Sequence, residues 1–286
     1  MKILITWYNW YVWNILYNNF VDNNTIYWVS KSSESEGNIF RCDCTDLNDV
    51  INLSKGIEPE VIIHAAWNKN LKWCETNPDE ALKTNGVSIE NIVKVWWDKA
   101  KIIFISSDYV FDWVNWDYKE NSLRNPQTVY WKTKVYWEDF GLNNSDNFFV
   151  VRLSALYDLN ATFPKFIRNN LENWLSIDCF TNVFYSPTYY KNFLSVIEWI
   201  INKWSKDMGN KVFHCEGEKI SRYDFAHKYA KIFWYNPDLI KPVDEELNNF
   251  LPWDLSLNNK ITLDTLWINN ISIEDALYEL KNNENI

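Results

Sequence analysis

Short apolar runs alternate along this chain with stretches in which apolar residues recur every three or four positions. The runs predict buried strands at 2–6, 25–29, 38–41, 61–66, 101–106 and 148–153. Helical spacing between them predicts helices at 14–20, 45–53, 78–95 and 128–141. Strands that alternate with helices in this way indicate right-handed crossovers, so we predict an α/β fold with a doubly wound parallel sheet.

The second half of the chain carries shorter elements. We expect helices at 162–171 and 189–203, strands at 175–179 and 210–215, and a closing helix at 272–280. Ser221 begins an S-x-x-D capping box that ends at Asp224, and 237–257 is expected to be irregular. We therefore expect one domain over 1–155, to which later segments return, and a smaller lobe over 156–286.

Composition excludes several classes of protein. The 286 residues carry a net charge of −10, and no basic cluster could neutralise a nucleic-acid backbone. No segment approaches a membrane span, and the apolar run at the N-terminus is too short for a signal peptide. Five scattered cysteines suit a reducing cytoplasm, and Cys42-x-Cys44 has no second pair at zinc spacing, so we expect no metal.

Glycine and tryptophan are present in unusual numbers, 6 and 18. Ordinary usage of about 7% would give roughly twenty glycines in a chain of this length. Tryptophan is a poor choice wherever a turn needs a positive φ, yet it occupies turn-like positions at 7, 10, 13, 67, 113, 116, 131, 137 and 267. We infer that many of these positions held glycine in the parent sequence.

The segment 7–13 lies between the first predicted strand and the first predicted helix. Its tryptophans at 7, 10 and 13 have the spacing of G-x-x-G-x-x-G, and a dinucleotide-binding turn occurs in this context. Three aromatic residues that pack a turn are an equally good interpretation. At the end of the second strand, Ser30 and Lys31 favour NADP over NAD, because a small polar and basic pair accommodates a 2′-phosphate; a solvated loop is the alternative.

A hydroxyl, a phenol and an amine are placed for reduction of a carbonyl. Ser107 lies at the carboxyl end of the fifth predicted strand, where ligands of such sheets bind. Tyr130 and Lys134 share one helix face, because residues four apart are neighbours. Tyr130 could protonate the alkoxide, Lys134 could favour the phenolate, and Ser107 could hold the substrate oxygen. The alternative is an ordinary surface pair on an amphipathic helix.

Two polar residues near this site have less specific interpretations. His64 ends the fourth predicted strand and is more often a satisfied core residue than a catalyst. Asn85 lies within a predicted helix, where asparagine is usually exposed but can also bond backbone or water near an active centre. A serine hydrolase built on Ser107, Asp108 and His64 is disfavoured, because the chain lacks a G-x-S-x-G elbow.

Taken together, the chain resembles the extended short-chain dehydrogenase/reductase superfamily, and within it the dTDP-4-dehydrorhamnose reductase group. The run S-S-D-Y-V-F-D at 106–112, joined to Y-x-K-T-K at 130–134, is specific to this group. Weaker matches keep the family order: the strand and turn at 2–13, His64-Ala65-Ala66, Lys72-Trp73-Cys74-Glu75, Tyr185-Ser186-Pro187-Thr188 and the Leu251-Pro252 segment with Ser256-Leu257.

The resemblance implies a Rossmann-like domain that binds NAD(P)H and a C-terminal lobe that binds a nucleotide sugar. It assigns catalysis to Ser107, Tyr130 and Lys134, with Ser107, Asp108 and Tyr109 also facing the substrate. It assigns cofactor binding to Trp7, Asn9, Trp10, Tyr11, Val12, Asp43, Cys44, Ala65, Ala66 and Asn85, beside Ser30, Lys31, Tyr130 and Lys134. The expected enzyme is a cytoplasmic oxidoreductase of surface-polysaccharide and dTDP-rhamnose biosynthesis, and we allow for a homodimer.

The chain departs from the group in the turn at 7–13 and on the substrate side. Where the group has R-x-S-W, this chain has Arg152-Leu153-Ser154-Ala155, and where it has R-P, this chain has Leu251-Pro252. These losses weaken the case for dTDP-4-dehydrorhamnose itself and leave another nucleotide-linked 4-keto-6-deoxy sugar open. Alternatives are an epimerase or dehydratase of a nucleotide sugar, or a non-catalytic NADP-binding subunit similar to the regulatory subunit of methionine adenosyltransferase.

Overall fold

The computed structural model describes residues 1–6, 10–32, 34–65, 71–112, 115–205, 209–244 and 254–284. The chain forms two compact units. The first comprises Met1–Asp112, Leu123–Arg152 and Ile197–Phe213, and the second comprises Trp113–Ser122, Leu153–Val196 and His214–Ile286. In the described parts, no helix is both long and apolar enough to cross a membrane.

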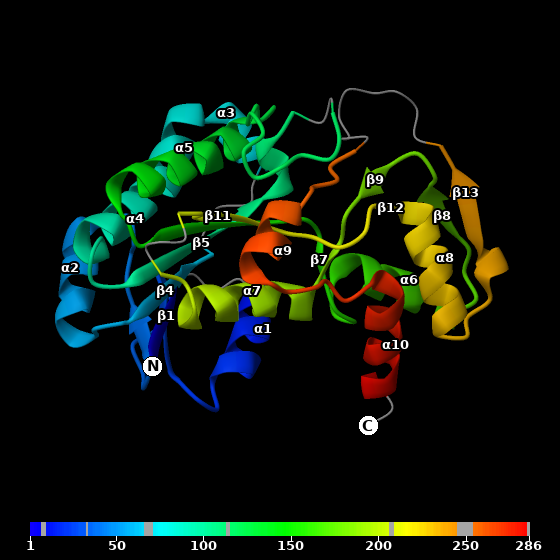
Figure 1. Cartoon of the computed structure of the whole chain (residues 1–286), viewed down its shortest axis with the longest axis horizontal. Coiled ribbons are helices and arrows are strands. Elements are labelled where there is room, and N and C mark those ends of the chain that lie inside the picture. Colours follow the sequence, from blue (N-terminus) through cyan, green and yellow to red (C-terminus); the bar gives the residue numbers. More distant parts are fainter. Residues whose placement is uncertain are drawn as a thin grey trace. The chain divides into compact units, whose positions relative to one another are not determined.

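A seven-stranded sheet, whose last strand runs into the second unit, organises the first unit (Figure 1). Its strands are β1 (Lys2–Thr6), β2 (Thr25–Ser30), β3 (Ile39–Arg41), β4 (Val61–His64), β5 (Lys101–Ser107), β6 (Phe148–Leu153) and β11 (Val212–Cys215). Their order is β11-β6-β5-β4-β1-β2-β3, and the pairs β1–β2, β1–β4, β2–β3 and β4–β5 are parallel. The predicted doubly wound α/β fold is confirmed.

Helices cover both faces of this sheet. The helices are α1 (Trp10–Phe20), α2 (Leu47–Gly56), α3 (Leu71–Thr76), α4 (Pro78–Trp96), α5 (Val129–Asn144) and α7 (Tyr190–Asn202). α2, α4 and α5 lie on one face, and α1 and the C-terminal half of α7 lie on the other (Figure 1). Asn19 of α1 bonds Glu198 of α7 at 2.8 Å, and Lys101 of β5 donates to the carbonyls of Ile200 and Ile201.

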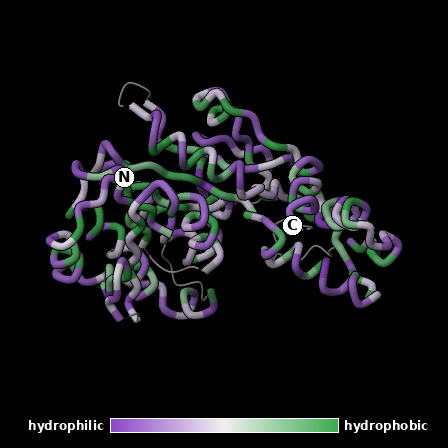
Figure 2. The backbone as a smooth tube through the Cα atoms, turned by 90° about the horizontal axis from the view of Figure 1, so that it is seen from below, coloured by the Kyte–Doolittle hydropathy of each residue, from purple (hydrophilic) through white to green (hydrophobic). Residues whose placement is uncertain are grey.

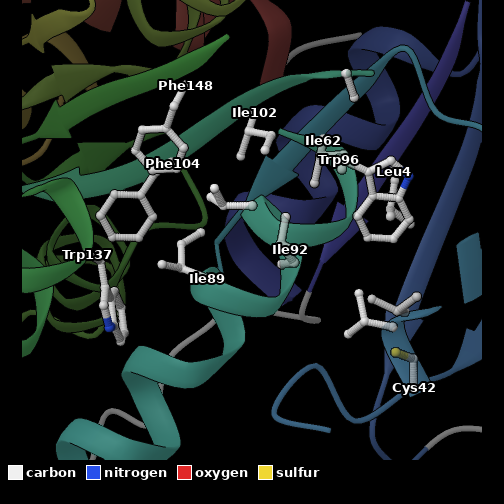
Figure 3. Packing of buried hydrophobic residues seen from close by; sticks show 14 of the residues in the cluster. Leu4, Cys42, Ile62, Ile89, Ile92, Trp96, Ile102, Phe104, Trp137 and Phe148 are labelled. Atoms are coloured by element: carbon white, nitrogen blue, oxygen red, sulfur yellow. The ribbon is translucent and has the colours of Figure 1, made fainter. Parts of the chain in front are cut away.

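The core of the first unit lies between the sheet and α4 and α5. Phe104 of β5 meets Trp137 of α5 edge to face, with ring centroids 5.5 Å apart, and Phe148 of β6 at 6.2 Å (Figure 3). Ile92 and Trp96 of α4 are also buried in this cluster. Apolar stretches alternate with polar stretches along the backbone (Figure 2), which is the pattern from which the strands and helices were predicted.

The second unit is built from short elements. Three two-stranded sheets pair β7 (Leu156–Tyr157) with β10 (Thr188–Tyr189), β9 (Phe184–Tyr185) with β12 (Ile220–Ser221), and β8 (Ile177–Phe180) with β13 (Ile240–Val243). Its helices include α6 (Thr162–Glu172), α8 (Arg222–Ile232), α9 (Lys260–Leu266) and α10 (Ile273–Glu284). The expectation that 237–257 is irregular was wrong at β13, which pairs with β8. Pro242 is tolerated there because both strands of a two-stranded sheet are edge strands.

Some helices begin where the sequence predicts, and others do not. Asp46 caps α2 by accepting from the Asn48 amide, and Ser221 caps α8 by accepting from the Asp224 amide, as the capping box predicts. α1 begins at Trp10 rather than at 14, so the segment 10–13 is helical and not part of a turn. The short helices α3 and α9 were not predicted, since six and seven residues are too few to show a helical period.

Candidate functional site

The strand order reverses between β1 and β4, because β2 lies on the other side of β1. Ligands of such sheets bind beyond the carboxyl ends of the strands at this point. Thr6 and His64 end the two strands there, and Thr6 Oγ1 lies 2.5 Å from His64 Nδ1. Among the described residues, none bonds His64 Nε2, which is fully buried. Burial and the nearby Lys134 charge lower the pKa of His64 to about 3, so its ring is neutral.

Ser107 ends β5 and begins the 3-10 turn η1 (Asp108–Val110). Its Oγ donates to Asp108 Oδ1 at 2.8 Å and accepts from the Tyr109 amide at 3.4 Å. The side chain of Ser107 is partly exposed, whereas Asp108 is buried. Ser107 thus has a defined position at the carboxyl edge of the sheet, with its hydroxyl held by its two neighbours.

Tyr130 is buried in the first turn of α5. Trp131 stacks on Tyr109 of η1 with ring centroids 4.6 Å apart, and its ring meets Tyr130 edge on at 4.4 Å. Because Ser107 caps η1, this aromatic contact brings the start of α5 to the same corner of the sheet as the Ser107 hydroxyl. Cys74 of α3 completes the buried surroundings of the Tyr130 ring.

Lys134 lies one helical turn after Tyr130 and is buried. Its Nζ donates to the Ile105 carbonyl of β5 at 3.1 Å and lies 4.9 Å from the centre of the Phe104 ring. The ammonium group is therefore held two residues before Ser107 in the same strand. The structure brings Ser107, Tyr130 and Lys134 to one corner of the first unit.

The expected effect of Lys134 on Tyr130 needs correction. Burial, and then the Cys74 thiol, raise the pKa of the Tyr130 phenol well above its usual value, which is opposite to the expected stabilisation of a phenolate. The physical reason is that a buried phenolate loses its hydration, while the Lys134 ammonium group is bonded to the Ile105 carbonyl. The Tyr130 phenol is accordingly protonated in this structure.

The predicted cofactor turn lies only partly within the described residues. Trp7, Asn9 and Ala66 lie outside them, and Trp10 is described only as the first residue of α1. Tyr11 and Val12 lie in the first turn of α1, where backbone amide groups have no intrahelical acceptor and favour an anion. Ala65 is buried beside β1, and its amide donates to the Thr6 carbonyl at 3.4 Å.

Ser30, Lys31, Asp43 and Cys44 gather beyond β2 and β3. Lys31 Nζ and Asp43 Oδ2 form an ion pair at 2.6 Å, with the lysine side chain largely exposed. Burial alone would raise the pKa of Asp43, but bonds from Lys31 and Thr45 outweigh it, and the pKa is lowered. Cys44 offers its carbonyl to Asn91 of α4 at 3.1 Å, and the Ser30 hydroxyl accepts from the Ser32 amide.

Asn85 is buried within α4, so the usual expectation of an exposed mid-helix asparagine does not hold here. Its carbonyl accepts from the Ser88 hydroxyl at 3.0 Å. α4 packs along α5, the helix that carries Tyr130 and Lys134. Across the described ranges, no group of three or more acidic, histidine or cysteine side chains is arranged to hold a metal ion.

A buried ionic network on α5 was missed in the sequence. Glu138 is fully buried and accepts from Ser106 Oγ at 2.5 Å, Arg152 at 2.7 Å and Arg124 at 3.0 Å. Burial alone would raise the pKa of Glu138, but the two guanidinium groups and the Ser106 bond lower it. A glutamate four residues after Lys134 was the available signal, since residues four apart lie on the same helix face.

The second unit holds a cavity of about 780 Å³. Acids and amides line it, among them Asp117, Glu216, Asp264, Asn258, Asn259 and Asn269. Burial, and then the carboxylates of Glu120 and Asp117, raise the pKa of Glu216 well above its usual range. Lys260 lines the same cavity, and the raised pKa of Glu216 favours its uncharged form.

Comparison with known proteins gives the family. The family described as "RmlD substrate binding domain" matches residues 1–250. Methionine adenosyltransferase 2 subunit beta of Xenopus tropicalis is 30% identical over 206 residues, which cover 68% of this chain and 60% of that protein. The chain thus spans about three fifths of the length of this curated relative.

Solved structures share the fold over the whole chain. A dTDP-4-dehydrorhamnose reductase from Clostridium acetobutylicum has a TM-score of 0.83 at 24% identity, with 100% of each chain covered. The enzyme of the same name from Bacillus anthracis, in complex with NADP, has a TM-score of 0.82 at 22% identity, with 98% of each chain covered. By its sequence and its fold, the chain belongs to the family of the RmlD substrate binding domain.

Proposed function

We propose that the chain is a short-chain dehydrogenase/reductase that uses NADPH to reduce the 4-keto group of a nucleotide-linked 4-keto-6-deoxy sugar. The observation that carries the proposal is the corner formed by Ser107, Tyr130 and Lys134 at the carboxyl edge of the sheet. The reductases with the same fold support the choice of substrate class. The proposal includes a role in surface polysaccharide synthesis and a location in the cytoplasm.

The side chains of the corner have distinct tasks. The Ser107 hydroxyl donates a hydrogen bond to the substrate oxygen in place of Asp108, its present acceptor. The Tyr130 phenol, kept protonated by burial, gives its proton to the developing alkoxide. Lys134 places a positive charge beside the reacting oxygen, which stabilises the negative charge that forms there.

The described residues fit a nicotinamide dinucleotide. The amide groups of the first turn of α1 suit a pyrophosphate, and Lys31 lies beyond β2, where a 2′-phosphate would lie. The unpartnered, buried Nε2 of His64 at the strand-order reversal is a polar atom that a ligand or ordered water could satisfy. The bound nicotinamide would supply the hydride. The tryptophans at 7, 10 and 13 are the part of the chain that does not suit this group.

The test is substrate-dependent consumption of NADPH by protein in which Trp7, Trp10 and Trp13 are changed to glycine. We expect turnover with at least one nucleotide-linked 4-keto-6-deoxy sugar. Tyr130→Phe should lower kcat by about a hundredfold or more, since general acids contribute on that order. NADPH binding, measured by fluorescence, should persist in Tyr130→Phe. A protein that binds NADPH and consumes none with any such sugar would refute the proposal.

A second candidate is a non-catalytic NADP-binding subunit. It is favoured by the 30% identity to methionine adenosyltransferase 2 subunit beta and by the substrate-side departures at Ala155 and Leu251. This candidate predicts a stable complex with a methionine adenosyltransferase catalytic subunit, measured by co-purification. It also predicts that Tyr130→Phe does not change how the subunit affects the activity of that partner. If the chain is a reductase, the same substitution abolishes its own activity.

A further inference from the structure

We infer that the tryptophans at left-handed backbone positions are glycine in the protein as its own cells make it, because one codon is read differently there. Of the described non-glycine residues, four have a positive φ: Asp117, Trp174, Trp234 and Trp267. Tryptophan accounts for three of these four positions, although the whole chain holds 18 tryptophans in 286 residues. The inference is independent of the proposed function.

The end of α6 forms a Schellman motif around Trp174. The Trp174 amide donates to the Leu171 carbonyl at 3.1 Å, and the Leu175 amide donates to the Asn170 carbonyl at 3.0 Å. This pair of bonds requires a left-handed residue at the central position, and Trp174 has φ 58°. Glycine is the usual residue there, because it has no Cβ to meet the neighbouring carbonyl.

The end of α8 repeats the same motif around Trp234. The Trp234 amide donates to the Lys231 carbonyl at 3.4 Å, and the Tyr235 amide donates to the Ala230 carbonyl at 2.9 Å. Trp234 has φ 63°, and Trp267, which ends α9, has φ 54°. Three helices therefore stop at a tryptophan in the conformation that most favours glycine.

These side chains also lack the packing that would justify an indole. Trp174, Trp234 and Trp267 are 75%, 85% and 92% exposed. Asp117, the remaining residue with a positive φ, is of a type that tolerates this conformation. An exposed indole contributes little burial to offset a strained backbone. Trp234 does carry the Lys281 ammonium group 3.1 Å from its ring centre, and Trp267 lines the cavity of the second unit, but neither contact buries the indole.

Other tryptophans have the opposite character. Trp204 is buried, donates its Nε1–H to the Asn210 carbonyl at 3.2 Å, and meets the Phe149 ring edge on at 4.6 Å. Trp96 and Trp199 are buried too, and their backbones are not left-handed. Trp137 belongs with these core residues, because it lies within α5 and is fully buried, so the expectation that it occupies a turn was wrong.

A single reassigned codon explains the tryptophans at left-handed positions. UGA is read as tryptophan in some genetic codes and as glycine in others, while UGG is the ordinary tryptophan codon. One difference in reading UGA would convert every such position at once, whereas independent substitutions would need a separate event at each. It also accounts for a chain with only 6 glycines, where roughly twenty are usual.

Two measurements test the inference directly. The gene should carry UGA at 174, 234 and 267 and UGG at 96, 199 and 204. Mass spectrometry of peptides from the protein made in its own cells should show glycine at the first three positions and tryptophan at the others. UGG codons at 174, 234 and 267, or peptides that contain tryptophan there, would overturn it.

A folding measurement supplies a third test. Trp174→Gly and Trp234→Gly should each raise the urea midpoint of unfolding or leave it unchanged, since each relieves a left-handed residue and removes an exposed indole. Trp204→Gly is the matched control and should lower the midpoint, because it removes a buried, hydrogen-bonded side chain. A clear loss of stability in both Trp174→Gly and Trp234→Gly would contradict the assignment of these positions to glycine.

Discussion

His64 combines complete burial with a neutral ring at the strand-order reversal. Burial and the Lys134 charge lower its pKa to about 3 in the folded chain, against about 6.5 when unfolded. Between these values the unfolded chain binds the extra proton. The stability that His64 provides is therefore complete above about pH 6.5 and is lost as the pH falls towards 3.

The pH dependence of unfolding tests this residue. Between pH 6.5 and pH 5, the free energy of unfolding of the native protein should fall by up to about 2 kcal/mol more than that of His64→Gln. This follows from a slope of about 1.4 kcal/mol per pH unit. Urea unfolding of both proteins at each pH measures the difference. Parallel pH profiles would mean that His64 is not held neutral by the fold.

Lys31 forms a 2.6 Å ion pair with Asp43 at the end of β2, where a 2′-phosphate would compete for it. Lys31→Ala should raise KM for NADPH about tenfold, equivalent to about 1.4 kcal/mol, and leave KM for NADH nearly unchanged. Lys55→Ala is the control, because it removes an exposed lysine of α2 that bonds Asn52 and should leave both KM values unchanged. Equal effects of Lys31→Ala on both cofactors would show that Lys31 does not select between them.

At the scale of elements, α5 carries both Tyr130 and the buried carboxylate of Glu138. Glu138 joins α5 to Ser106 of β5 and to Arg152 of β6, so one side chain fixes the helix against the strand that ends at Ser107. The network is buried, so the loss of either partner leaves a charge without compensation in the core.

Removing the charge of the Glu138 carboxylate should destabilise the folded protein. Glu138→Gln should lower the free energy of unfolding by about 3–5 kcal/mol, because Arg152 remains buried and charged. Asp139→Asn removes the neighbouring, half-exposed partner of Arg124 and should cost less than about 1 kcal/mol. Urea unfolding of the two variants gives the comparison, and similar small losses would show that the buried pair does not hold α5.

The strands of the sheet were predictable because buried parallel strands read as continuous apolar runs; Phe148–Leu153 is one such run with the bounds expected. The contacts of the candidate site were not predictable in the same way. The bond from Lys134 to Ile105 and the stack of Trp131 on Tyr109 depend on how α5 docks on the sheet. Spacing along the chain places side chains on a face and does not reveal which atoms they meet.

At the scale of the whole molecule, two questions are separate: what chemistry the fold supports, and whether this sequence performs it. We propose that Ser107, Tyr130 and Lys134, at their common corner, carry this chemistry. The tryptophans at 7, 10 and 13 bear on the second, because indoles obstruct the approach of a pyrophosphate to the backbone. Protein with glycine at these positions is therefore the form in which the reductase and the non-catalytic subunit should be compared.

The most direct measurement is the transfer of deuterium to the sugar from NADPH that carries deuterium at both hydrogen positions of C4. The glycine-containing protein should place deuterium on carbon 4 of a nucleotide-linked 4-keto-6-deoxy sugar with one equivalent of NADPH oxidised, and Tyr130→Phe should do so at least about a hundredfold more slowly. Mass spectrometry and NMR of the product locate the label. Binding of NADPH without deuterium in any such sugar would contradict the account and favour the non-catalytic subunit.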